Sequence, residues 1–285
     1  MNIASLLDRA SKSMIDSRHP LASLLRWPRW LIACAVGRPK MARFATGGLR
    51  MELIPRLKAF GSTAIFIRRD EYEPELLAVK RVIRPGSTVI DIGGSYGIFS
   101  LFMAHFAGPE GRVFTFEPGR FSFGRLTRNI ALNRMEQRIL IHNLAASDTA
   151  QLLMLSHFAD SPVNFSVGAL VDGVEAEQVK AERVDAIVPK GRWADVTFIK
   201  IDVEGYEKSA LEGARGIIET AHPVVMFEVS DAALARQDMT ASDMFAFMAS
   251  LGYRMWLLDA QKRFVPTETP QEGNIFAAIG DLSKL

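Results

Sequence analysis

Asp91 and the glycine-rich loop that follows it form the pattern in this sequence best suited to binding a ligand. The stretch 88–92 (TVIDI) is largely apolar, as expected of a central parallel strand, and the loop 93–97 (GGSYG) leads into a predicted helix. The dinucleotide fingerprint G-x-G-x-x-G fails because Ser95 stands at its second glycine, and no P-loop lysine follows. A carboxylate ahead of the first glycine repels a diphosphate and favours a ligand with an ammonium and a sulfonium group.

A second acid, Glu117, ends the next predicted strand, 112–116, and stands 26 residues after Asp91. A carboxylate at the tip of this strand can accept two hydrogen bonds from a ribose diol. The alternative is an exposed acid at the start of a helix.

Two further acids, Asp202 and Glu204, follow the predicted strand 196–201 (VTFIKI). In extended backbone, residues two apart face the same side, so both carboxylates are expected beside the ligand. One would orient an ammonium group and the other would accept a proton from an acceptor hydroxyl. The alternatives are that Glu204 caps the helix predicted over 205–218, and that Lys200 forms an ion pair with one of the acids.

Three residues are candidates for the general base: Asp202, Glu204 and His157. His157 lies in the stretch 156–182, which is predicted to be irregular and to shape the acceptor site; a surface-loop histidine is the alternative. No metal site is predicted, although the two acids could also chelate Mg²⁺ together with substrate oxygens.

Five motifs in order resemble the class I S-adenosylmethionine-dependent methyltransferases, and more narrowly the FkbM family. They span about residues 64–230 and read VIDIGGSYGIFS, GRVFTFEP, RLTRNIALN, NLAASD and FIKIDVEGYEKSALEGA. The family often has Ala-Asn where this chain has Gly94-Ser95. The resemblance implies an α/β, Rossmann-like fold: a seven-stranded, mostly parallel sheet with an antiparallel edge strand and helices on both faces.

The resemblance also implies S-adenosyl-L-methionine as cofactor, with Asp148 at the position that meets adenine. A β-turn aspartate without a ligand is the alternative at that position. From their place ahead of the first core helix, Tyr72 and Glu73 are expected to close over the amino-acid end of the donor. The implied binding residues are Asp91, Gly93, Gly94, Ser95, Tyr96, Gly97, Glu117, Pro118, Ala146, Ser147, Asp148, Asp202 and Glu73.

The implied reaction is methylation of a hydroxyl on a small metabolite or a glycan. Similar enzymes that methylate nucleic-acid amines carry Asn/Asp-Pro-Pro-aromatic where this chain has Asp-Val-Glu-Gly. N-methylation stays open, as does a non-catalytic donor-binding protein acting through a basic arm. An NAD-dependent reductase is disfavoured by Asp91 and Ser95.

Composition and charge limit the partners. Of 285 residues, 48% are hydrophobic, and the single cysteine excludes a disulfide framework and a Cys-based zinc site. This predicts a soluble, cytoplasmic protein. Residues 1–69 carry 13 Lys+Arg against 3 Asp+Glu, a net of +10, whereas residues 86–285 carry 18 against 25, a net of −7. The acidic body argues against a nucleic-acid partner.

We expect a basic extension over 1–69, made of short helices and a β-hairpin, and a methyltransferase domain over 70–285. The hairpin strands are predicted at 49–54 and 64–69, and the extension would serve as a lid or an oligomer contact. Near the other end, the stretch 259–269 is predicted to be a polar turn between two antiparallel edge strands.

The extension offers two kinds of partner. No signal peptide is expected, and residues 21–36 are too short and too charged to span a bilayer. Peripheral membrane contact through residues 1–60 and a homodimer contact both stay open. Side chains that suit a membrane interface gather there: Arg26, Trp27, Arg29 and Trp30.

Overall fold

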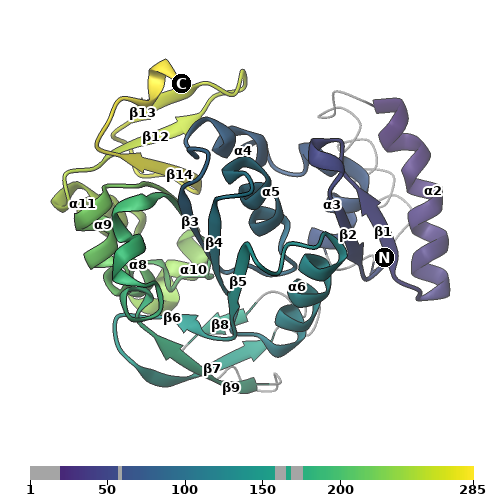
Figure 1. Ribbon diagram of the computed structural model, residues 1–285, viewed down its shortest axis with the longest axis horizontal. Coiled ribbons are helices and arrows are strands. Elements are labelled where there is room, and N and C mark those ends of the chain that lie inside the picture. The colour runs from purple at the N-terminus through teal and green to yellow at the C-terminus, as the bar shows by residue number, and fades with distance from the viewer. Residues whose placement is uncertain (1–19, 57–59, 158–164, 168–175) are drawn as a thin grey trace. The chain divides into compact units, whose positions relative to one another are not determined.

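The computed structural model describes residues 20–56, 60–157, 165–167 and 176–285 (Figure 1). The chain divides into two compact units, residues 1–77 and 78–285. The domain boundary predicted from the sequence, between residues 69 and 70, lies inside the first of these units.

The first unit contains a helix pair and a β-hairpin. Helix α2 (Pro20–Val36) packs on helix α3 (Phe60–Arg68), and β1 (Lys40–Arg43) pairs antiparallel with β2 (Arg50–Leu53). The strand predicted over 64–69 is therefore wrong, because most of it lies in α3. Its apolar run fits a short strand and a buried helix equally well, and packing against α2 decides for the helix.

The second unit is built on an eight-stranded sheet with the order β13-β12-β14-β11-β10-β3-β4-β5. The five strands from β11 to β5 are parallel, and β14 is antiparallel to both of its neighbours. The strands are β3 (Thr88–Ile92), β4 (Arg112–Phe116), β5 (Ile139–His142), β10 (Val196–Ile201), β11 (Val224–Val229), β12 (Arg254–Leu258), β13 (Phe264–Thr267) and β14 (Gly273–Ala278). This is the expected Rossmann-like fold of class I methyltransferases.

The sheet differs from the prediction at one side. The antiparallel strand β14 lies between β11 and β12 and not at the edge, and β13 adds an eighth strand within the stretch predicted to be a polar turn. The polar residues of that stretch led to the prediction of a turn. A proline is tolerated in β13 because this strand lies at the edge of the sheet.

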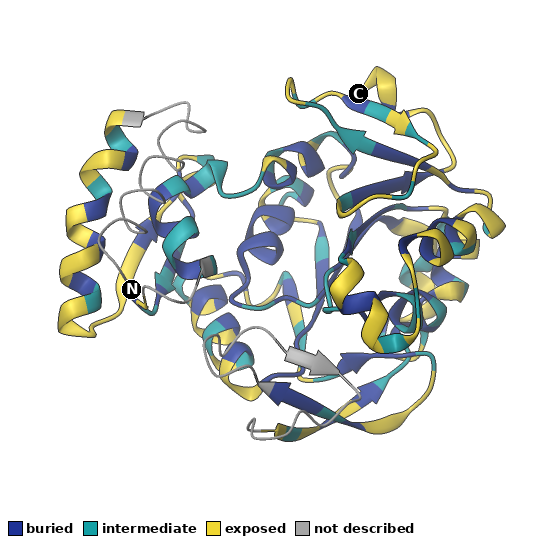
Figure 2. Ribbon diagram, turned by 180° about the vertical axis from the view of Figure 1, so that it is seen from behind, coloured by how far each residue is buried: buried dark blue, intermediate teal, exposed yellow. Residues whose placement is uncertain are grey.

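Helices cover both faces of the sheet, with α5 and α6 on one side and α8, α9 and α11 on the other (Figure 1). Every residue of β3 and of β10 is consequently buried (Figure 2). The helix predicted over 205–218 divides in two at Ala214. The helices are α4 (Pro74–Ala78), α5 (Ile98–Ala107), α6 (Arg120–Leu132), α7 (Val184–Ile187), α8 (Glu207–Gly213), α9 (Arg215–Ala221), α10 (Asp231–Leu234) and α11 (Ala241–Ser250).

A second, four-stranded sheet is inserted after β5, with the order β6-β9-β7-β8. The stretch 156–182 was predicted to be irregular, but it contains two of these strands. The pattern was easy to miss because the inner face of β9 has few apolar residues, chiefly Val179 and Ala181. The strands are β6 (Ala145–Ala146), β7 (Gln151–His157), β8 (Phe165–Val167) and β9 (Ala176–Glu182).

Candidate functional site

The predicted site residues come mainly from the ends of neighbouring strands. β4, β3, β10 and β11 are adjacent and parallel, so the segments that follow them meet at one edge of the sheet. These segments include the loop 93–97, Glu117 and Asp202. Glu228, near the end of β11, belongs to the same edge.

The glycine loop packs closely between the ends of β4 and β10. The N–H groups of Gly93 and Gly94 both donate to the carbonyl of Phe116, at 2.9 and 3.0 Å. Gly93 has a φ of +81°, and a Cβ there would lie 1.9 Å from the carbonyl oxygen of Asp202. At Gly94 a Cβ would lie 2.3 Å from the side chain of Thr115. Close packing therefore requires both glycines, in addition to any ligand that the loop binds.

Asp91 is fully buried beneath this loop. Ser100 Oγ donates to Asp91 Oδ2 at 2.5 Å, and Lys200 Nζ lies 3.7 Å from Oδ1. Burial raises the pKa of Asp91, whereas Lys200 and then Ser100 lower it. The direct contact of Asp91 with a ligand stays a prediction; its observed partners are protein groups.

Lys200 connects the strand ends. Its ammonium donates to the carbonyl of Gly93 at 2.8 Å and lies 3.2 Å from Asp202 Oδ2. The predicted ion pair with one of the two acids after β10 is confirmed, and the partner is Asp202. Since Lys200 also neutralises part of the charge of Asp91, this one side chain fixes the loop and both acids relative to one another.

Glu117 is buried at the tip of β4 and holds the glycine loop from the other side. Its two carboxylate oxygens accept hydrogen bonds from the backbone N–H groups of Ser95, at 2.7 Å, and Gly119, at 2.9 Å. Burial raises its pKa to about 7, against the lowering by these hydrogen bonds. Each oxygen accepts one of these two hydrogen bonds, so each has acceptor capacity left for a hydroxyl. The alternative of an exposed acid does not hold.

Four carboxyl groups near the ends of β10 and β11 form what we call the acidic cluster: Asp202, Glu204, Glu207 and Glu228. Glu228 lies close enough to Asp202 for the charge of one carboxyl group to act on the other. Burial, followed by the charges of Asp202, Glu204 and Glu207, raises the pKa of Glu228 to about 8. The pKa of Glu204 is also raised, by burial and then by Asp202.

Glu207 holds the turn between β10 and α8. Its Oε1 accepts from the N–H groups of Val203 and Gly205, both at 3.1 Å. Its Oε2 is buried and has no hydrogen-bond partner among the residues described. Burial raises the pKa of Glu207 to about 7.

The backbone at Glu204 is not extended, as the sequence analysis assumed. Glu204 has a φ of +56° and Gly205 a φ of +103°, so the chain turns sharply between Asp202 and α8. The extended backbone on which the predicted common orientation of Asp202 and Glu204 depends is therefore not present. The two carboxylates are nevertheless close enough for the charge of Asp202 to act on Glu204.

The Asp148 carboxylate is hydrogen-bonded to helix α8. Ser209 Oγ donates to Asp148 Oδ1 at 2.7 Å, which together with Ser147 lowers the pKa of the carboxyl group. A Cβ on Gly213 would lie 2.0 Å from the carbonyl oxygen of Ser147. The segment implied to meet adenine is thus held directly against α8.

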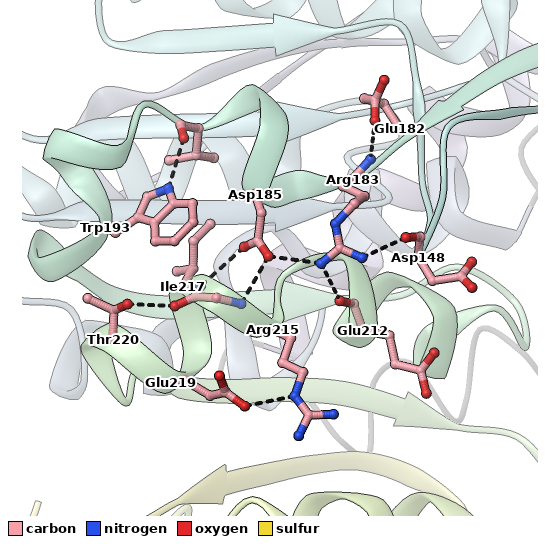
Figure 3. Close-up of polar contacts among 12 residues, drawn as sticks. Asp148, Glu182, Arg183, Asp185, Trp193, Glu212, Arg215, Ile217, Glu219 and Thr220 are labelled. Atoms are coloured by element: carbon pink, nitrogen blue, oxygen red, sulfur yellow. Dashed lines mark hydrogen bonds and ion pairs between the residues drawn. The ribbon is translucent and has the colours of Figure 1, made fainter.

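Arg183 fixes the same segment from a third element (Figure 3). Its guanidinium donates to the carbonyl oxygens of Asp148, at 2.6 Å, and Glu212, at 3.0 Å, and to Asp185 Oδ2, at 3.1 Å. Asp185 in turn accepts from the N–H groups of Gly216 and Ile217 at the start of α9. Sequence reasoning missed this network because its contacts are largely to backbone atoms.

The remaining predicted site residues include Glu73, His157, Tyr96 and Pro118. Glu73 belongs to the first unit, and its role in closing the site stays a prediction. His157 ends β7, and its side chain lies outside the described residues. Tyr96 is buried, and its carbonyl accepts from Asn129 Nδ2 at 2.9 Å. Asn143 donates to the carbonyls of Glu117 and Pro118 at 2.9 and 2.8 Å.

The acidic cluster was only partly foreseen. Glu207 and Glu228 were not among the predicted site residues, although Glu228 near a strand end repeats the placement of Asp91. Within the described residues, no group of three or more His, Cys, Asp or Glu side chains could hold a metal ion.

Comparison with known proteins gives consistent family names. A family model described as the methyltransferase FkbM domain matches residues 91–255, which is more than half of the chain. The 31-O-demethyl-FK506 methyltransferase FkbM of Streptomyces tacrolimicus is 26% identical over 160 residues, which are 46% of this chain and 60% of that protein. Methyltransferase sdnD of Sordaria araneosa is 30% identical over 120 residues, 41% of this chain and 43% of that protein. This chain thus matches less than two thirds of the length of either relative.

Solved structures are more distant. A methyltransferase FkbM from Methylobacillus flagellatus KT is 18% identical, with a TM-score of 0.44 over 79% of this chain and 56% of that one. An S-adenosylmethionine-dependent O-methyltransferase from Thermotoga maritima is 14% identical, with a TM-score of 0.42 over 84% of this chain and 77% of that one. At this distance the two structures carry no argument about the site.

Proposed function

Since the chain belongs to the FkbM methyltransferase family, we propose that it transfers a methyl group from S-adenosylmethionine to a hydroxyl group of a small metabolite or a glycan. The name of the Streptomyces relative, an O-demethyl-substrate methyltransferase, supports an oxygen acceptor. The local support is the charge of the strand ends, which suits a positively charged donor.

The donor fits the charge of the site. Lys200 lies beside Asp91 and Asp202, and the other three carboxyl groups of the acidic cluster are near Asp202. Glu207 Oε2 is buried without a hydrogen-bond partner among the described residues. A diphosphate would meet repulsion from these groups, whereas a ligand with an ammonium and a sulfonium would relieve it. This surplus of negative charge is the single observation that carries the choice of donor.

Two parts of the site have separable tasks. Glu117 can accept a ribose diol through the acceptor capacity left on its two oxygens while it holds the glycine loop through Ser95. When bound, S-adenosylmethionine supplies an electrophilic methyl group. A carboxylate of the acidic cluster can take up the proton that the acceptor hydroxyl loses. Positioning of the acceptor is the other requirement, because methyl transfer depends strongly on alignment.

Titration calorimetry with S-adenosylmethionine and with S-adenosylhomocysteine tests the donor. We expect Glu117→Gln to weaken donor binding about tenfold or more, which corresponds to about 1.4 kcal/mol. Glu219→Gln is the matched control, because Glu219 is exposed and pairs only with Arg215 among the interactions described. Absence of binding to the wild-type chain, or equal binding by both variants, would overturn the donor site.

Methyl transfer is then followed with a labelled donor and a panel of hydroxylated and amine-bearing acceptors. Label recovered on oxygen supports the proposal, and label recovered on nitrogen favours the N-methyl alternative. Tight binding of donor and product with no transfer to any acceptor would instead favour a non-catalytic donor-binding protein.

A further inference from the structure

Helix α2 of the first unit has one apolar face inside and a second apolar face outside. Its inner residues Ser23, Trp27, Trp30 and Ala33 are buried. The Trp30 ring stacks on Phe66 with centroids 4.7 Å apart, and its Nε1 donates to Thr63 Oγ1 at 2.9 Å. These contacts bury the inner face of α2 against α3, as expected of a surface helix with one apolar face. Packing within this unit does not require a second apolar face.

The tryptophans therefore do not form a membrane-facing surface, although the sequence made them the first candidates. Arg26 is also used internally, since it donates to the carbonyl of Ile67 at 2.6 Å. If α2 binds a further partner, other side chains must do so.

The outer face of α2 provides such side chains. Leu21, Leu25, Ile32 and Val36 are 75%, 64%, 63% and 58% exposed. Together with Pro28 these positions repeat at the spacing of one helix face. Leu24 and Leu31 widen the stripe, and the one charged residue exposed on the helix is Arg29. Figure 2 shows the exposed residues along α2.

This exposure is unusual within the described chain. Six of its twelve exposed large hydrophobic side chains lie on the 17 residues of α2. Scattered apolar residues need no partner, but a continuous stripe indicates a binding surface.

Charge indicates the kind of partner. Residues 20–43 contain five basic residues and no acidic residue, namely Arg26, Arg29, Arg38, Lys40 and Arg43. Arg38, Lys40 and Arg43 are exposed just beyond the end of the helix. Leucine and isoleucine on one face with arginine and lysine beside them is the composition of helices that lie in the interface of an anionic bilayer.

We propose that the outer face of α2 binds the surface of an anionic lipid bilayer, with the helix lying in the plane of the interface. None of the helices in the described residues is long and apolar enough to cross a membrane, which agrees with a peripheral mode. A second copy of the chain is disfavoured as the occupant, because it would bring two segments of net charge +10 together. This proposal does not depend on the donor or the acceptor.

Flotation of the full chain with lipid vesicles tests the proposal. We expect binding to vesicles with about 30% phosphatidylserine and much weaker binding to pure phosphatidylcholine vesicles. Raising the salt to about 0.5 M should weaken the binding, since the charged part of the attraction is screened.

The variant Leu25→Ser/Ile32→Ser should reduce the partition coefficient at least about tenfold, because both side chains are lost from the apolar stripe. The matched control is Leu152→Ser, which changes a leucine that is 59% exposed in the second unit, and it should bind like the wild type. Circular dichroism and light scattering of each variant record folding and mass.

Two further outcomes would overturn the proposal. One is wild-type binding that is absent or indifferent to phosphatidylserine. The other is a dimer that Leu25→Ser/Ile32→Ser converts to a monomer without changing vesicle binding, which would assign the face to a second copy. A companion variant, Leu25→Lys/Ile32→Lys, separates charge from apolar insertion. It adds positive charge but should still lose binding, because insertion of the apolar side chains is needed.

Discussion

Replacing Glu228 by glutamine should make the protein more stable in alkali and leave its stability in acid nearly unchanged. The cause is burial, followed by the nearby charges of Asp202, Glu204 and Glu207, which together raise the pKa of Glu228 from 4.5 to about 8. Because the folded chain holds this proton more tightly than the unfolded chain, stability is lost as the pH rises between these two values. A neutral glutamine removes that loss.

The size of the effect follows from the same shift. Raising a pKa from 4.5 to about 8 corresponds to at most about 5 kcal/mol between acid and alkali. Glu228 is only partly buried, so water screens part of the repulsion. We therefore expect the Glu228→Gln variant to gain about 2 kcal/mol over the wild type at about pH 9 and almost nothing at about pH 5.

Urea unfolding at several pH values, followed by circular dichroism and tryptophan fluorescence, measures this difference. Glu219→Gln serves as a control, since Glu219 is exposed and pairs with Arg215. A variant that is equally stable relative to the wild type at every pH, or is less stable in alkali, would refute the raised pKa of Glu228. Agreement of the two probes shows whether the two units unfold together.

Three further predictions address the loop, the network and the charge. Gly93→Ala should lower the free energy of unfolding by about 3 kcal/mol or more, because its Cβ would lie 1.9 Å from the carbonyl oxygen of Asp202. The control is Gly86→Ala, at a glycine with the same φ of +81° and open space around it, and it should cost about 1 kcal/mol. Urea unfolding measures both. Arg183→Lys should weaken donor binding about tenfold in calorimetry, because a lysine cannot bridge Asp148, Glu212 and Asp185; an unchanged affinity would remove its positioning role. Donor affinity should rise from about pH 6 to about pH 8, since Glu117, Glu207 and Glu228, with pKa values of about 7 to about 8, become charged in that range; a flat profile would contradict a cationic ligand near these groups.

The parallel part of the sheet could be read from the sequence because each of its strands is buried on both faces. Runs such as TVIDI and VTFIKI have no polar face, which distinguishes them from surface strands. The acids within or directly after such runs were found for the same reason, since a charged residue there is conspicuous. Asp91, Glu117 and Asp202 were identified in this way.

Short or weakly patterned elements were missed. The run at 64–67 (AIFI) is too brief to have a recognisable period, so only its packing against α2 reveals a helix. β13 contains a proline, and the inner face of β9 has few apolar residues. In each case tertiary contacts decide the structure, and local pattern does not contain them.

The details of the site depend on backbone geometry that a linear pattern does not show. The positive φ of Glu204 turns its carboxylate out of the expected register. Glu207 is the first residue of α8, where an acid ordinarily indicates favourable interaction with the helix dipole and not a buried group with a raised pKa. Glu228 was visible near a strand end, but its closeness to Asp202 was not.

The position of β14 bears on how this chain is made. β14 (Gly273–Ala278) joins β11 to β12, although both of those strands are synthesised earlier. During translation β12 and β13 therefore emerge before the strand that joins them to the main sheet, and the edge of β11 that will pair with β14 is still unpaired. The sheet is completed only when residues 273–278 emerge and insert between β11 and β12. Until then the nascent chain exposes two unpaired strand edges, and we expect it to depend on holdase chaperones in that interval.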